Sequence, residues 1–224
     1  MMEAMWTRFL PAMCQIRSWL HEGVIGEIKH IRATFGFNCP FNPNNRLYNL
    51  NLAGGSLLDA GIYPLSFANM VINHPPIEIK ALGEIGRTGV DEQTCIILKY
   101  ESGSLALLNS AINTPTASSA EIVGTKGRIL IPRDFLRAQD VHLELIHQKP
   151  ALHRFSFADE TGFKFEIEAA SQSIRDGLLE NPIMTLSDSL QIMESIDSIK
   201  KQLGLRYSND RDTAVQLRAE GSYV

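Results

Sequence analysis

An aspartate and a tyrosine four positions apart are the residues of this chain best suited to do chemistry. They lie in the segment Gly54-Gly55-Ser56-Leu57-Leu58-Asp59-Ala60-Gly61-Ile62-Tyr63-Pro64. If this segment is helical, Asp59 and Tyr63 share one face, one turn apart. A phenol beside a carboxylate can hold or move the proton of a hydroxyl group. The structural alternative is that Asp59 is a first-turn carboxylate favoured by the helix dipole, and that Tyr63 places its ring in the core.

The elements around this segment must position the two side chains. The pattern predicts a helix over 56–72, whose regular part begins near Gly61 because Pro64 suits a first turn better than an interior. The glycines before it permit close backbone approach or a positive φ. They do not form the G-x-G-x-x-G fingerprint of a phosphate loop, and that fingerprint appears nowhere in the chain. The polar, asparagine-rich stretch 38–52 predicts a long loop of the kind that often carries function.

Helices are predicted at both ends of the chain and strands between them. Apolar residues at helical spacing predict a helix over 2–21, kinked or divided at Pro11. Runs rich in β-branched residues predict strands over 27–37, 77–86, 93–100, 104–113, 120–124, 128–131, 141–147 and 154–157. Two amphipathic helices are predicted at 165–179 and 187–203, and we expect Gly204 to cap the C-terminus of the second.

This order of elements predicts an α+β fold in which helices cover one face of an open, mainly antiparallel sheet. Residues 1–207 would form that domain, and 208–224 a polar C-terminal tail. The other sheet face would be left bare. Because a bare sheet invites aggregation and self-association covers it, we expect a homodimer formed through the sheet.

Composition narrows the class of protein. The chain has 224 residues, of which 44% are hydrophobic, and a net charge of −4. No basic stripe favours nucleic acid or an anionic membrane, and no apolar run approaches the ~20 residues that span a bilayer. Cys14, Cys39 and Cys95 are odd in number and widely spaced, which favours reduced thiols and a cytoplasmic location. The histidines lack ligand-like spacing, so we expect no metal site.

Three pieces of the sequence together resemble the Gfo/Idh/MocA oxidoreductases. They are Glu3-Ala4-Met5-Trp6-Thr7-Arg8-Phe9-Leu10-Pro11, the segment 54–64 and the closing Met193-Glu194-Ser195-Ile196-Asp197. Within the family, the likeness is to the branch of dimeric dihydrodiol dehydrogenases and NADP-dependent D-xylose dehydrogenases. It covers about residues 2–207.

In that family a Rossmann domain precedes an α+β domain that binds substrate and forms the dimer. This chain looks like the second domain. The resemblance therefore implies that the N-terminal Rossmann domain is absent, that no residue here binds the NAD or NADP cofactor, and that the chain alone is inactive.

The resemblance also assigns roles to residues. Tyr63 resembles the residue that transfers the proton, and Asp59 would hydrogen-bond the substrate or orient Tyr63. Trp6, Arg8 and Phe9 resemble the segment that borders the substrate, where Trp6 would wall the pocket and Arg8 would anchor polar groups. The alternative for these three is an amphipathic helix with core aromatics and one solvated arginine.

Two further arginines, Arg32 in the predicted strand 27–37 and Arg87 at the end of the predicted strand 77–86, lie in regions that could contact substrate hydroxyls. The alternative is that both are surface charges. The implied reaction is hydride transfer between a nicotinamide and a hydroxyl of a sugar, polyol or diol. A second hypothesis is a cofactor-free remnant that acts as a dimeric binding or interaction module.

Overall fold

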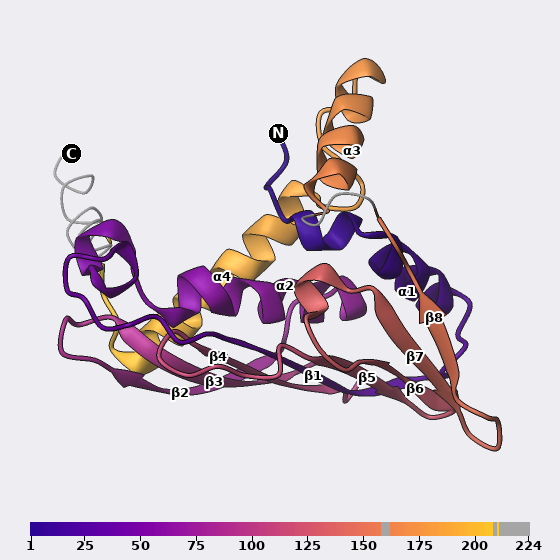
Figure 1. Cartoon of the computed structure of the whole chain (residues 1–224), viewed down its shortest axis with the longest axis horizontal. Helices are drawn as coiled ribbons and strands as arrows, with labels where there is room; N and C mark the ends of the chain where they lie inside the picture. Colours follow the sequence, from indigo (N-terminus) through magenta and orange to yellow (C-terminus); the bar gives the residue numbers. More distant parts are fainter. Residues whose placement is uncertain (158–161, 208–209, 211–224) are drawn as a thin grey trace, which may run out of the picture.

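An open eight-stranded sheet with helices on one face forms the base of the molecule (Figure 1). This computed structural model describes residues 1–157, 162–207 and 210. The strands are β1 (Ile28–Gly36), β2 (Glu78–Ile85), β3 (Asp91–Lys99), β4 (Leu105–Ala111), β5 (Ala120–Gly124), β6 (Gly127–Ile131), β7 (Asp140–Leu145) and β8 (Ala151–Arg154).

The sheet is mainly antiparallel, as the sequence predicts. Its strand order is β2-β3-β4-β1-β5-β6-β7-β8, and the one parallel pair joins β1 to β4. That pair is parallel because the chain leaves β1, crosses the sheet through α2 (Ile62–Ile72), and returns by the β2–β3–β4 meander. The helical segment that carries Asp59 and Tyr63 therefore lies over the middle of the sheet.

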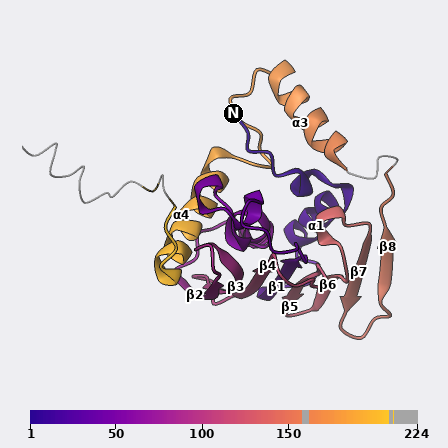
Figure 2. The same cartoon turned by 60° about the vertical axis from the view of Figure 1, so that its left-hand side comes forward.

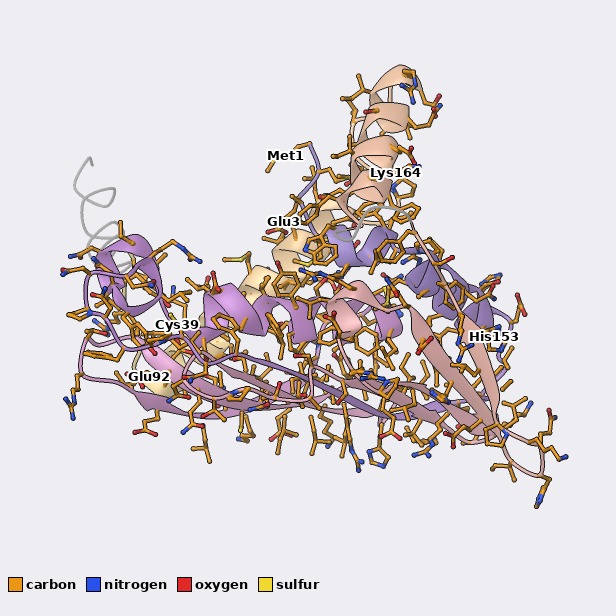
Figure 3. All side chains as sticks on the ribbon, in the orientation of Figure 1. Met1, Glu3, Cys39, Glu92, His153 and Lys164 are labelled. Atoms are coloured by element: carbon orange, nitrogen blue, oxygen red, sulfur yellow. The ribbon has the colours of Figure 1, made fainter. Side chains whose placement is uncertain are left out.

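The two faces of the sheet differ in cover. Along β1, Ile31 and Ala33 are fully buried under the helices, while Arg32 between them is exposed, as the two-residue period of a strand requires. Figure 3 shows the side chains of the other face projecting away from the helices with nothing packed on them. Leu82, Ile97 and Leu107 are 82%, 49% and 42% exposed on strands of this sheet.

The helices begin and end where local chemistry predicts. A 3₁₀ turn, η1 (Trp6–Phe9), precedes α1 (Pro11–His21), and Pro11 occupies the first helical position, so the proline divides the N-terminal helix. α4 (Leu186–Leu203) begins at a capping box in which Thr185 and Asp188 bond each other's backbone N–H, and it ends at Gly204 with φ 67°.

Two predicted elements differ from the structure. The last strand lies at Ala151–Arg154 instead of 154–157, because the turn through His147, with φ 64°, brings Ala151 opposite Leu143 on β7. The helix predicted over 165–179 is α3 (Phe163–Arg175), which has no buried residue and projects away from the sheet (Figure 2). The predicted tail, 208–224, lies outside the described residues apart from Asp210. Within the described part, no helix has the length and apolar character needed to cross a membrane.

Candidate functional site

Tyr63 stands in the first turn of α2, over the middle of the sheet. Its half-buried ring meets the ring of Phe35 on β1 edge to face, with centroids 5.6 Å apart and planes at 89°. Phe37 extends this aromatic wall, 5.7 Å from Phe35. The Tyr63 hydroxyl has no hydrogen-bond partner among the described residues. The phenol is thus fixed by its ring and free at its oxygen.

Asp59 lies one turn earlier, in a π-helical turn, η4 (Leu57–Gly61), that runs directly into α2. Such wide turns are rare and are frequently found at functional sites. The side chain forms an ion pair between its Oδ1 and Nη2 of Arg46. No hydrogen bond joins Asp59 to Tyr63 in the described part of the chain. The partner of the carboxylate is therefore an arginine that the sequence alone did not single out.

Arg46 lies in the asparagine-rich loop. Arg46 begins a 3₁₀ turn, η2 (Arg46–Tyr48), in which the side chain of Asn45 accepts a hydrogen bond from the backbone of Leu47. The Tyr48 ring is 1% exposed, and its hydroxyl donates to the backbone oxygen of Cys39 at 2.7 Å. The predicted loop is thus an ordered element at one end of the sheet, where Figure 3 labels Cys39.

The two positions before the helix require glycine because a side chain there would collide with neighbouring atoms. A Cβ on Gly54 would lie 2.4 Å from the backbone oxygen of Arg46, and a Cβ on Gly55 would lie 2.2 Å from Oδ1 of Asp91. Gly55 also has φ 117°, which L-residues rarely adopt. The backbone that leads to Asp59 is therefore pressed against the loop on one side and against β3 on the other.

Asp91, the first residue of β3, caps the start of the helical segment. Its Oδ2 accepts hydrogen bonds from Ser56 Oγ at 2.7 Å, the Leu57 backbone N–H at 2.7 Å and Thr94 Oγ1 at 2.8 Å. Its Oδ1 is buried and has no partner among the described residues. Burial raises the pKa of this carboxyl, against the opposing effect of the hydrogen bonds from Ser56, Thr94 and Leu57.

The end of the described chain braces the same segment. The Tyr207 hydroxyl donates to the backbone oxygen of Gly54 at 2.8 Å. Burial raises the pKa of Tyr207, and the nearby carboxylates of Asp91 and Asp210 act in the same direction. Tyr207 therefore stays a neutral hydrogen-bond donor at physiological pH, and it fixes the backbone that enters the site.

Trp6, Arg8 and Phe9 lie inside the fold. Trp6 and Phe9 are 9% and 4% exposed, and the Trp6 ring meets Phe163 edge to face at 4.9 Å. Arg8 is 3% exposed. Its guanidinium donates to Ser66 Oγ at 2.9 Å, to the Ser66 backbone oxygen at 2.9 Å and to Asn69 Oδ1 at 2.6 Å, and it pairs with Asp188 at 3.5 Å.

The internal partners of Arg8 join η1 to α2 and α4, so this guanidinium serves the fold. The alternative of a solvated arginine is wrong, because the side chain is buried. The hydrogen-bond and ion-pair partners of Arg8 lie far from it in the sequence. Residue spacing therefore does not predict these contacts.

The structure does not bring Arg32 and Arg87 to Tyr63. Arg32 is 63% exposed, pairs with Glu121 at 3.4 Å, and points to the bare face of the sheet, opposite the helices. Its odd separation from Phe35 on β1 already places the two side chains on different faces. Arg87 is exposed in the turn between β2 and β3, and no hydrogen bond or ion pair joins it to Asp59 or Tyr63.

Comparison with known proteins identifies the class of protein. A model described as the GFO/IDH/MocA C-terminal domain matches residues 13–130. The trans-1,2-dihydrobenzene-1,2-diol dehydrogenase of Xenopus tropicalis is 36% identical over 215 residues, and that of Danio rerio 34% over 216 residues. The chain belongs to the Gfo/Idh/MocA family, so the resemblance predicted from the three motifs is confirmed. The matched region is 92% of this chain but only 64% of the Xenopus protein, so the chain spans less than two thirds of this relative's length.

Solved structures share the fold. The aldose-aldose oxidoreductase of Caulobacter crescentus, complexed with glycerol, superposes with a TM-score of 0.78 at 24% identity over 90% of this chain and 61% of that protein. A levoglucosan dehydrogenase in complex with NADH and levoglucosan superposes with a TM-score of 0.77 at 17% identity, over 90% of this chain and 63% of the other. At these identities the comparison confirms the open, mainly antiparallel α+β fold.

Proposed function

We propose that this chain is the substrate-binding and dimerisation part of an NAD(P)-dependent oxidoreductase that acts on a hydroxyl of a sugar, polyol or diol. The observation that supports this most is the Tyr63 phenol, fixed by Phe35 and free at its oxygen, one turn from an ion-paired aspartate. The relatives named above are diol dehydrogenases, and they contribute the reaction class.

In this proposal Tyr63 and Asp59 have separate roles. When the carbonyl is reduced, the Tyr63 hydroxyl donates its proton to the carbonyl oxygen and becomes a phenolate; in the direction of oxidation, that phenolate takes the proton of the substrate hydroxyl and becomes the phenol again. Asp59 accepts a hydrogen bond from the substrate and so fixes its orientation. The nicotinamide, when bound, supplies the hydride chemistry.

The glycine pair before the candidate helix does not form a cradle for the diphosphate of that cofactor. The only paired glycines near the site, Gly54 and Gly55, are packed against Arg46 and Asp91 and present no open backbone to a ligand. We therefore propose that NAD or NADP is bound mainly by a domain equivalent to the part of the relatives that this chain does not match.

The bare face of the sheet supports the homodimer. Ile97 on β3 and Leu107 on β4 lie directly opposite each other in register, and both are exposed. They border a shallow hollow of about 610 Å³ that Leu82 also lines. Apolar side chains in an exposed sheet centre favour association with a second copy.

Fusion of this chain to the unmatched N-terminal part of the Xenopus tropicalis relative tests the assignment. We expect NAD(P)-dependent oxidation of a diol, and we expect Tyr63→Phe to lower kcat by roughly 10²-fold or more. Tyr100→Phe is the matched control, because Tyr100 is a buried tyrosine directly after the last residue of β3, at the opposite end of that strand from Asp91. Near-normal turnover of Tyr63→Phe would refute the proton-transfer role. A folded fusion without any activity would instead favour the binding-module hypothesis.

A further inference from the structure

The ion pair between Arg46 and Asp59 leaves hydrogen-bonding groups of both side chains open to solvent. The Arg46 and Asp59 side chains are 57% and 23% exposed. The contact uses one carboxylate oxygen, Oδ1, and one nitrogen, Nη2. Among the described residues, Asp59 Oδ2 and the other guanidinium N–H groups have no partner. A carboxylate oxygen only accepts hydrogen bonds and a guanidinium only donates them, so the pair presents an acceptor and donors side by side.

The backbone that carries Arg46 is anchored, although the side chain itself is 57% exposed. Its backbone is held by the Asn45 cap and by the burial of Leu47 and Tyr48, which are 9% and 1% exposed. The backbone oxygen of Arg46 lies against Gly54, where a Cβ would reach to 2.4 Å. The planar guanidinium is itself rigid, so little freedom is lost when it binds a second oxygen.

We propose that Arg46 and Asp59 together form a subsite for two adjacent hydroxyl groups, in which Arg46 is a specificity-determining residue. One hydroxyl donates to Asp59 Oδ2, and its neighbour accepts from an Arg46 N–H. A lone hydroxyl can use only one half of the subsite, so vicinal diols bind more tightly than the matching monoalcohols. This inference rests on the proposed function, since it names the substrate class of the same site.

The alternative is an ordinary surface ion pair, which contributes little to stability and nothing to binding. Two observations favour the subsite. Asp59 lies one helical turn before Tyr63, and the loop that carries Arg46 is anchored by buried side chains instead of extending into solvent. The open groups therefore belong to an ordered part of the fold, and Asp59 shares the helical segment of Tyr63.

Binding to the 224-residue chain tests the subsite without any turnover. Titrations with trans-1,2-cyclohexanediol and with cyclohexanol, followed by ¹H–¹⁵N NMR shifts, give the preference for adjacent hydroxyls. We expect Arg46→Ala to weaken diol binding about 10-fold or more and to leave cyclohexanol binding unchanged, because a charged hydrogen bond is lost only for the diol. Arg46→Lys keeps the charge but not the planar fork, so an intermediate loss is expected.

Arg154→Ala is the matched control, because Arg154 is 77% exposed and pairs with Asp140 on the outer strands. It should change neither affinity, and all variants should keep the wild-type melting temperature within a few degrees. The proposal is overturned if Arg46→Ala keeps the diol preference, if it weakens both ligands equally, or if the wild-type chain shows no preference or no binding. Because the readout needs no hydride transfer, an inactive fusion that keeps an Arg46-dependent diol preference would refute the dehydrogenase assignment alone.

Discussion

Asp91, at the start of β3, accepts a hydrogen bond from the backbone N–H of Leu57 at 2.7 Å and so ties the sheet to the segment that carries the candidate site. This contact joins residues 34 positions apart. It does for the π-helical turn what an N-cap side chain does for an ordinary helix. The placement of Asp59 and Tyr63 therefore depends on β3 as well as on their own helix.

The capping role of Asp91 predicts how stability changes with pH. Its pKa is raised in the folded state, so ionisation destabilises the fold. The contribution of the protonated carboxyl is fully present below the unfolded pKa of about 4, and it is lost as pH rises through the raised folded value. Asp91→Asn has no such ionisation. We therefore expect the free energy of unfolding of the wild type, relative to this variant, to fall between pH 4 and pH 7 in urea titrations.

Asp91→Ala is the companion variant. It leaves the Ser56 and Thr94 hydroxyls and the Leu57 N–H without their acceptor, and should cost about 1–3 kcal/mol near pH 4, where the wild-type carboxyl contributes most. A pH-independent difference between wild type and Asp91→Asn would contradict the raised pKa.

Gly55 should tolerate no side chain. Gly55→Ala places a Cβ against Asp91 Oδ1 at a φ of 117°, and should lower the free energy of unfolding by roughly 3 kcal/mol or more. Gly103→Ala is the control that has the backbone strain without the collision. Gly103 also has a positive φ, 81°, but nothing lies within 4 Å of the added Cβ. A cost of about 1 kcal/mol is expected there. Equal costs, measured by chemical denaturation, would show that the contact with Asp91 contributes nothing.

Arg8 should be a stability residue. Arg8→Met removes the partner of the buried Asp188 and leaves Ser66 and Asn69 without their donor, so the variant should lose about 3 kcal/mol or more of unfolding free energy. Arg154→Met breaks the exposed pair with Asp140 and should lose at most about 1 kcal/mol. An Arg8→Met variant that loses little unfolding free energy but binds diols more weakly would contradict this prediction and would favour a role for Arg8 in substrate binding.

The bare face of the sheet predicts a dimer that one charge can break. Leu107→Glu places a carboxylate beside Ile97, and burial of that charge against a second copy is unfavourable. Sedimentation at micromolar concentration should show a dimer for the wild type and a monomer for the variant. Leu190→Glu, on an exposed position of α4, should remain dimeric. A monomeric wild type would refute the interface.

Much of the fold could be predicted because it follows from local chemistry. Pro11 divides the N-terminal helix by its missing N–H, Gly204 ends the last helix with a positive φ, and the strands follow β-branched alternation. The last strand was misplaced because its pairing with β7 is set by a turn at His147, where an ordinary residue takes a left-handed conformation.

The sequence by itself determined that Asp59 and Tyr63 stand one turn apart, since helical spacing is a property of neighbouring residues. The residues that contact and support this pair could not be predicted in the same way, because they come from distant segments. Only the tertiary structure decided that Arg46 pairs with Asp59, that Asp91 caps Leu57 and that Arg8 is buried among Ser66, Asn69 and Asp188. Those contacts depend on strand register and loop closure over long separations, and no local pattern encodes which polar groups such packing will bring together.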